Sequence, residues 1–301
     1  MDADYLIDRH RLKRRVTFWR VAAIVIAVAL VATAIGRFFG ASSQSYIARL
    51  DVARIIVNDP DRLNALDAII GDPNVKALLV TINSPGGTVV GGEALYHALV
   101  RAGEKIPIVA VMGDLATSAG YMIAVASDHI VAREGTITGS IGVLFQTAEI
   151  TDLLGKLGIS VEAIKSGPLK AEPSPFSKLT PAVRRSTQIL VDDMFDMFVS
   201  MVANQRNMTP QRVRSLADGR VFTGRMALKE GLVDAIGGER EALQWLTEKK
   251  GVDKDLPVRK LTIKRDVQDW FEHLSTLARK TVLSERLTLD GLVSVWHPQL
   301  Q

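Results

Sequence analysis

The sequence predicts an α/β fold built on a largely parallel sheet, because unbroken apolar runs alternate with segments of helical periodicity. Strands buried on both faces are apolar throughout, whereas half-buried strands alternate with polar residues. Runs of the first kind occupy residues 53–57, 77–82, 107–112 and 128–132. The alternation shows no internal repeat, so a single copy of the unit is expected.

Helices are predicted between these strands, where apolar residues recur at helical spacing; the segments are 61–70, 91–104 and the small, apolar stretch 118–126. Farther along, Thr180 and Pro181 are suited to begin a long helix, as cap and first-turn residue. Its methionine and phenylalanine residues predict a face in the core or at a subunit interface, with a substrate groove as the alternative.

The N-terminal part predicts a membrane anchor. Residues 18–39 are apolar apart from Arg20 and Arg37, and a helix of that length reaches about 30 Å, the thickness of bilayer hydrocarbon. The basic residues before it keep the N-terminus in the cytoplasm and predict that the rest is exported. A cleaved signal peptide, for which Ala32–Ala34 has the required small residues, and a buried core helix are the alternatives.

The C-terminal part, residues 251–301, contains an amphipathic pattern at 266–283. This pattern predicts a helix that packs on its own or a neighbouring subunit, or lies on the membrane.

The composition of the chain limits the possible chemistry: the absence of cysteine excludes a thiol nucleophile and disulfides. Lys and Arg exceed Asp and Glu only by 37 to 33, which gives no reason to expect nucleic-acid binding.

Two glycine-rich or small-residue turns follow predicted strands. In the first, Gly86 and Gly87 can expose backbone amides to a negative charge, and Thr88 can cap the next helix; an ordinary tight turn is the alternative. In the second, Ser118 opens a helix, where its hydroxyl is either a nucleophile or a simple cap. The amide of Ala119 is then available to bind an oxyanion.

A serine nucleophile requires a base. None of the five histidines has a flanking acid pattern that marks a catalytic triad; they are His10, His97, His129, His273 and His297. Lys170 is the other candidate, because a lysine surrounded by apolar residues and prolines loses water and becomes a proton acceptor. From composition alone, a solvated loop lysine remains the alternative.

The segments LATSAGYMIAVASD, GTITGSIGV, IKSGPLKAEPSPF and ADGRVFTGRMALKEGLVDAIGG resemble, in order and spacing, the signal peptide peptidase A family of membrane-anchored Ser-Lys peptidases, in its short single-repeat form. The resemblance covers about residues 49 to 248. It implies a ClpP/crotonase-like α/β fold with a largely parallel sheet, Ser118 as nucleophile and Lys170 as general base. It also implies that Ser140 orients the lysine and that Gly87 and Ala119 supply oxyanion amides.

The resemblance further implies no metal and no cofactor, a homo-oligomer, and extended apolar peptides such as signal-peptide remnants as substrates, cleaved at the periplasmic face of the bacterial inner membrane. The expected divisions are a basic N-terminus (1–17), a transmembrane helix (18–39), a linker (40–48), the peptidase domain (49–250) and the C-terminal extension (251–301).

Rival interpretations use similar turns. A soluble ClpP-type enzyme has a histidine about 25 residues beyond its serine, where this chain has Val143. A crotonase would be separated from its acyl-CoA substrate by export. A peptidase of the NfeD-associated type and an inactive assembly scaffold remain alternatives.

Overall fold

The computed structural model describes residues 16–31, 44–263 and 292–295. The chain divides into two compact units, Met1–Ser45 and Tyr46–Gln301. In the first unit, residues 16–31 form a helix. Over the described ranges, none of the helices meets the length and apolarity needed to cross a bilayer. The predicted transmembrane segment continues to residue 39, and its last part lies outside the described residues.

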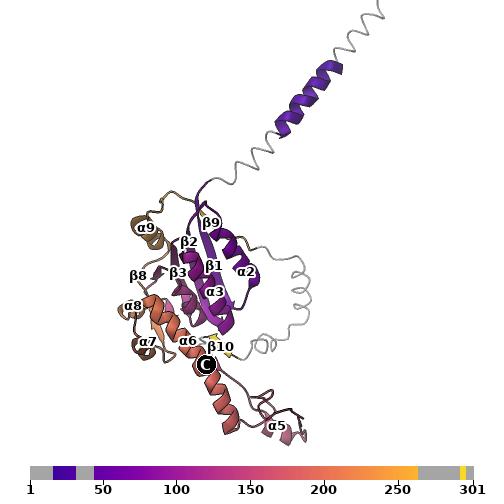
Figure 1. The fold of residues 1–301 in the computed structure, drawn as a ribbon, viewed down its shortest axis with the longest axis vertical. Helices are drawn as coiled ribbons and strands as arrows, with labels where there is room; N and C mark the ends of the chain where they lie inside the picture. Colours follow the sequence, from indigo (N-terminus) through magenta and orange to yellow (C-terminus); the bar gives the residue numbers. More distant parts are fainter. Residues whose placement is uncertain (1–15, 32–43, 264–291, 296–301) are drawn as a thin grey trace, which may run out of the picture. The chain divides into compact units, whose positions relative to one another are not determined.

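The second unit is built on one sheet, which contains ten strands within the described residues (Figure 1). They are β1 (Tyr46–Ile56), β2 (Val75–Thr88), β3 (Ile108–Thr117), β4 (His129–Ala132), β5 (Ile137–Gly139), β6 (Leu144–Phe145), β7 (Val221–Thr223), β8 (Ala235–Ile236), β9 (Val258–Lys260) and β10 (Leu292–Val295).

The centre of the sheet is parallel, as the sequence predicts. Strands β1, β2, β3, β4 and β8 pair in that order, each parallel to its neighbour, and β9 pairs parallel with the outer side of β1. Antiparallel pairs occur toward the carboxyl ends of the central strands: β5 with β7, and β10 with both β2 and β6. Ligand sites in parallel sheets lie at this end of the strands.

Helices connect and cover the strands; they are α2 (Pro60–Ile70), α3 (Val89–Gly103), α4 (Ala119–Ala124), α5 (Thr151–Lys156), α6 (Pro181–Arg206), α7 (Pro210–Leu216), α8 (Gly224–Lys229) and α9 (Glu239–Lys250). The predicted caps are confirmed, since Thr88 accepts a hydrogen bond from the Gly91 amide and Thr180 from the Val183 amide, at 3.1 and 3.3 Å. These short side chains satisfy amides that the first helical turn leaves without backbone partners.

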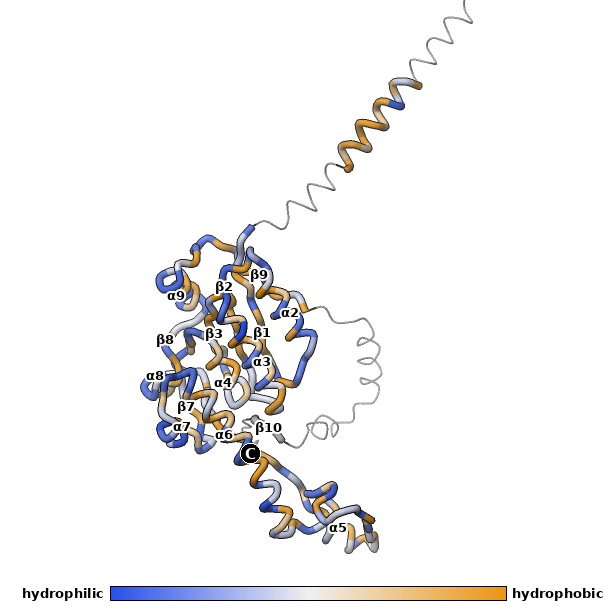
Figure 2. Tube along the Cα trace, viewed as in Figure 1, coloured by the Kyte–Doolittle hydropathy of each residue, from blue (hydrophilic) through white to orange (hydrophobic). Residues whose placement is uncertain are grey.

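Both faces of the sheet are covered, which explains the unbroken apolar runs. In β2, Leu78 and Val80 face the large core beneath α2, α3, α4 and the end of α6, while Ala77 and Leu79 face a smaller core. The smaller core is closed by α9 through Leu246 and its neighbours. Figure 2 shows the apolar colouring concentrated along these central strands and the helices over them.

Helix α6 is buried only in part. Its C-terminal half contributes Phe198 and Met201 to the core, whereas Ile189 and Leu190 in its N-terminal half are exposed. Figure 1 shows this half running away from the sheet body toward α5. The predicted core face is therefore confirmed for one half of the helix. The amphipathic segment 266–283 lies outside the described residues.

Candidate active site

Ser118 occupies a strained turn between a strand and a helix. Strand β3 ends at Thr117 and α4 begins at Ala119, so the serine alone turns the chain, with φ 57° and ψ −119°. Few residues other than glycine adopt a positive φ, and such strain gathers at functional sites. The Ser118 amide donates to the Gly139 carbonyl at 2.8 Å, and the residue is 1% exposed. A serine on a sharp strand-to-helix turn is the arrangement of nucleophilic serines in several hydrolases.

The last residues of β2, Ser84–Thr88, lie beside this turn. Ser84 is fully buried, donates its hydroxyl to the Arg54 carbonyl at 2.5 Å and accepts the Gly86 amide at 3.1 Å. Gly86 has φ 115°. A Cβ on Gly87 would stand 1.8 Å from the Ile56 carbonyl oxygen, so no side chain fits there. The sequence predicts a turn here, but Gly86 and Gly87 continue β2 and pair with Ile55 and Ile56 of β1, an approach that only glycine allows at position 87.

Direct contacts hold the two turns together. The Thr117 hydroxyl, just before Ser118, donates to the Pro85 carbonyl at 3.0 Å. A Cβ on Gly92 of α3 would stand 3.0 Å from the Cβ of Ala119, so the two helices approach closely behind the turns. Gly87 and Ala119, whose amides are both predicted to bind an oxyanion, therefore belong to adjoining segments, the end of β2 and the start of α4.

Ser140 is brought to the same place by strand register. β5 runs parallel to β3 and pairs Gly139 with Thr117, so Ser140 and Ser118 directly follow paired residues. Ser140 also has a positive φ, 50°, is buried, and its amide donates to the Arg220 carbonyl at 2.8 Å. Two predicted site residues, far apart in sequence, thus adjoin in the fold.

Lys170 differs from these residues, because its side chain is exposed in the loop between α5 and α6. The sequence predicts that apolar neighbours exclude water from it, yet Pro168 and Leu169 are themselves exposed. The described residues of a single chain do not enclose the lysine. The dry environment that a lysine base needs therefore has to come from outside them.

The histidines that the structure describes lie away from Ser118. His97 is exposed on α3. His129 pairs with Val109 at the start of β3, whereas Ser118 follows the end of β3, about 25 Å along the strand. Its ring stacks on Trp245 with 4.6 Å between centroids, and burial lowers its pKa. The remaining histidines lie outside the described residues.

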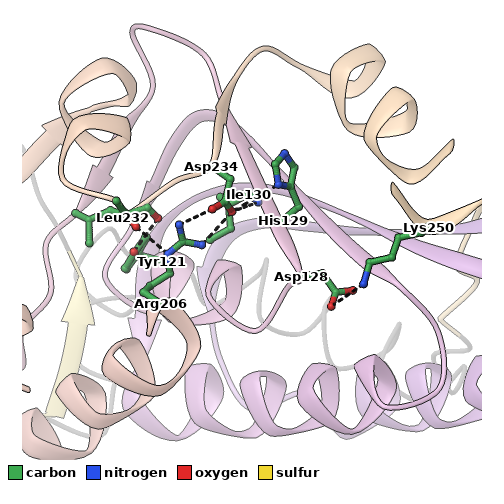
Figure 3. Close-up of polar contacts among 9 residues, drawn as sticks. Tyr121, Asp128, His129, Ile130, Arg206, Leu232, Asp234 and Lys250 are labelled. Carbon is green, nitrogen blue, oxygen red and sulfur yellow. Dashed lines mark hydrogen bonds and ion pairs between the residues drawn. The ribbon is translucent and has the colours of Figure 1, made fainter. Parts of the chain in front are cut away.

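A buried polar network fixes the far side of α4 (Figure 3). Tyr121, three residues beyond Ser118, donates its hydroxyl to the Leu232 carbonyl at 2.9 Å, and burial raises the pKa of this phenol. Arg206, at the end of α6, donates to both carboxylate oxygens of Asp234 at 2.9 and 2.6 Å. Because an unpaired buried polar group is costly, this network restrains α4 and hence the serine turn.

Sequence reasoning did not single out Ser84, Thr117 or Tyr121 as residues that shape the site. Each acts through a bond to a backbone carbonyl of a distant segment, and such a bond leaves no local pattern. The positive φ values of Ser118 and Ser140 could not be predicted from the sequence either. For Ser118, the available signal was a polar residue within a small, apolar stretch, which by itself left a nucleophile and a helix cap as alternatives.

Comparisons with known proteins agree with this geometry. A family model described as peptidase family S49 matches residues 101–253. "Putative protease slr0021" of Synechocystis sp. is 42% identical over 219 residues, which cover 72% of this chain and 79% of that protein. "Putative signal peptide peptidase SppA" of Enterococcus faecium is 38% identical over 64% of this chain and 56% of its own length.

A plant protein extends the comparison. "Serine protease SPPA, chloroplastic" of Arabidopsis thaliana is 31% identical over 72% of this chain, but the match covers only 32% of the plant protein. The family match includes β5, the 157–180 loop and α6 as well as Ser118. The chain therefore belongs to peptidase family S49 and is a serine peptidase.

Proposed function

We propose that this protein is a membrane-anchored endopeptidase in which Ser118 is the nucleophile and Lys170 the general base. The observation that carries the proposal is the strained turn at Ser118, held against the end of β2, where no side chain fits at Gly87. A serine that merely capped a helix would accept an amide of the first turn, whereas Ser118 makes no side-chain cap bond to α4.

The proposed reaction has the following steps. Uncharged Lys170 accepts the Ser118 hydroxyl proton as the oxygen attacks a peptide carbonyl, and the Gly87 and Ala119 amides stabilise the oxyanion. The charged lysine then returns the proton to the leaving amine, and water hydrolyses the acyl-enzyme. Ser140, adjoining Ser118, accepts a hydrogen bond from the lysine and orients it.

The exposure of Lys170 supports a homo-oligomeric enzyme. A lysine accepts a proton at neutral pH only where water is excluded, and the single chain does not exclude it. The surrounding surface is unusually apolar, since Leu144, Leu157, Ile164 and Phe176 are exposed on β6 and the loop. Exposed apolar surface of this kind marks protein interfaces. A neighbouring copy is the partner we propose to cover it.

Strand pairing supports an extended peptide as substrate. β10 lies antiparallel to Gly86–Thr88 of β2 and to Leu144–Phe145 of β6. The pairing shows that this edge of β2 accepts an extended strand, and a substrate peptide that takes the place of β10 would bind by strand addition. The apolar segment at 18–39 and the basic residues before it favour a site at the outer face of the bacterial inner membrane, where signal-peptide remnants are the proposed substrates.

Hydrolysis of casein and of a fluorogenic apolar peptide by the detergent-solubilised protein tests the proposal. Ser118→Ala and Lys170→Ala should both be inactive while retaining the oligomeric state of the unchanged protein. Glu162→Gln, an exposed change in the loop of Lys170, is the control and should remain active. Equal rates in all four proteins would contradict the proposal and favour a scaffold. If Lys170→Ala is active while Ser118→Ala is inactive, Lys170 is not the base.

A further inference from the structure

The loop that carries Lys170 contains neither helix nor strand, yet it has a defined conformation. It spans residues 157–180 between α5 and α6. The Lys170 amide donates to the Gly167 carbonyl at 3.1 Å, and the Glu172 amide donates to the Leu169 carbonyl at 3.3 Å. Two overlapping turns therefore bracket the lysine, and Ala171 next to it has φ 59°.

One carboxylate joins the two sides of this loop. Glu172 accepts from the Lys165 ammonium at 2.5 Å, from the Ser174 amide at 3.0 Å and from the Ser177 hydroxyl at 2.9 and 3.0 Å. The donors come from five residues before Lys170 and from four and seven residues after it. Charge-assisted hydrogen bonds to one acceptor thus close the loop around the lysine.

The ion pair is more enclosed than a surface pair. The side chains of Glu172 and Lys165 are 9% and 22% exposed, whereas most ion pairs of this protein lie farther in solvent. Donation by Lys165 and then by Ser177 lowers the pKa of Glu172, so its carboxylate remains charged near neutral pH. Exposed ion pairs contribute little to stability because water and salt screen them, and the enclosure of this pair reduces that screening.

Apolar packing alone does not fix the loop. A cavity of about 320 Å³ separates Leu169, Ala171 and Pro173 from the N-terminal half of α6, where Val183 and Leu190 line it. Because side chains across a cavity share few contacts, the position of the loop depends more on its polar bonds.

The same arrangement separates the two lysines of the segment IKSGPLK. A general base has to be neutral, whereas a carboxylate partner stabilises the charged ammonium. Lys165 donates to the Glu172 carboxylate, whereas the side chain of Lys170 is exposed in the part of the loop between these two residues. Their roles therefore differ: the first lysine closes the loop and the second is available for proton transfer.

We propose that Glu172 is a positioning residue, whose carboxylate binds Lys165, Ser174 and Ser177 and thereby holds the backbone of Lys170 in one place relative to the nucleophile. The inference rests on the proposed role of Lys170. Effective proton transfer needs a base placed within hydrogen-bond reach, and small displacements reduce rates strongly.

A set of full-length variants tests it: Glu172→Gln, Glu172→Asp, Lys165→Gln, the double variant Glu172→Gln/Lys165→Gln, and the control Glu162→Gln. With the fluorogenic peptide, Glu172→Gln should lower kcat 10- to 100-fold with KM unchanged within about twofold. Glu172→Asp, which retains the charge, should recover part of the loss. If the pair acts as a unit, the double variant is no slower than the slower single variant.

Hydrogen exchange supplies a readout that does not depend on catalysis. Amides within 165–177 should exchange faster in Glu172→Gln than in Glu162→Gln, with exchange in the C-terminal half of α6 unchanged. Unchanged exchange in the loop, or a kcat within twofold of the unchanged protein, overturns the inference. If Glu172→Gln does not fold, Lys165→Gln decides by the same two measurements.

The failure of the inference and that of the proposed function are distinguishable. Activity in Lys170→Ala rejects the lysine as base whatever Glu172 does. An inactive Lys170→Ala together with a fully active Glu172→Gln leaves the proposed function in place and rejects the positioning role alone.

Discussion

The Ser118 amide donates to the Gly139 carbonyl at 2.8 Å, so the strand that leads to Ser140 also holds the strained backbone of Ser118. Strain at this turn should be measurable. Both Ser118→Ala and Ser118→Gly remove the hydroxyl, but only glycine adopts φ 57° without steric cost.

We therefore expect the free energy of unfolding of Ser118→Gly to be about 1 kcal/mol higher than that of Ser118→Ala. Glycine relieves the backbone strain, and this gain exceeds the loss from the entropy that glycine adds to the unfolded chain. Urea unfolding of the two inactive variants gives the comparison. A lower stability for the glycine variant would show that the turn is not strained.

Gly87→Ala tests how tightly the end of β2 is packed against β1. The added Cβ would lie 1.8 Å from the Ile56 carbonyl oxygen, so β1 and β2 have to separate at that point. We expect a loss of stability of about 3 kcal/mol or more, together with loss of peptide hydrolysis. Gly135→Ala is the matched control, because a Cβ there meets nothing within 4 Å. Equal thermal midpoints for the two variants would contradict the packing.

The parallel core could be predicted from sequence because both faces of β2 and β3 are buried, and burial leaves unbroken apolar runs. Strands of two or three residues, such as β6 and β5, are too short to carry a periodic pattern. The N-terminal half of β1 was missed, since it alternates apolar residues with Arg49 and Asp51, which pair with each other at 2.7 Å.

The site was predictable to the extent that each residue acts through its own turn. Ser118 follows β3 as predicted, whereas Gly87, predicted in a turn after a strand, lies within the last residues of β2. The surroundings of Lys170 could not be predicted. The segments that pack over a loop decide whether water reaches it, and the local composition of the loop does not specify those segments. Pro168 beside the lysine gives the segment its apolar character but is itself exposed.

Tyr121→Phe should weaken the support of α4. The substitution leaves the buried Leu232 carbonyl without this donor, while retaining the ring. We expect a loss of about 1 to 2 kcal/mol in the free energy of unfolding. Tyr96→Phe is the control: its hydroxyl accepts from the Gln205 side chain at 3.1 Å, and this partner can turn toward water. An equal or smaller loss for Tyr121→Phe would argue against the support.

His129 should make the protein less stable in mild acid. Burial lowers its folded pKa below the ordinary value, while Asp234 opposes and Arg206 adds to the shift. Below the ordinary histidine pKa, the unfolded chain binds more protons than the folded one. The stability that neutral His129 allows is therefore fully present above about pH 6.5 and is lost as pH falls.

His129→Phe retains a ring to stack on Trp245 and removes the titration. Urea unfolding at pH 7.5 and pH 5.5 should show a smaller loss on acidification for the variant than for the unchanged protein. An identical loss in both proteins would exclude His129 as a contributor to the pH dependence.

The pairing of β10 with Gly86–Thr88 predicts competition with substrate. An extended peptide that adds to this edge of β2 needs the backbone positions that residues 292–295 occupy. Val293→Pro removes an amide donor and disfavours the strand, so we expect a lower KM for the fluorogenic peptide with kcat little changed.

Val293→Thr keeps both the amide and a β-branched side chain, and it should leave KM as it is. The comparison isolates strand pairing, because both substitutions alter the same side chain and only one prevents pairing. If the proline and threonine variants share the KM of the unchanged protein, the peptide binds elsewhere along the sheet. A lower KM in the proline variant alone would assign the edge at Gly86–Thr88 to the substrate, directly beside the turn that holds Ser118.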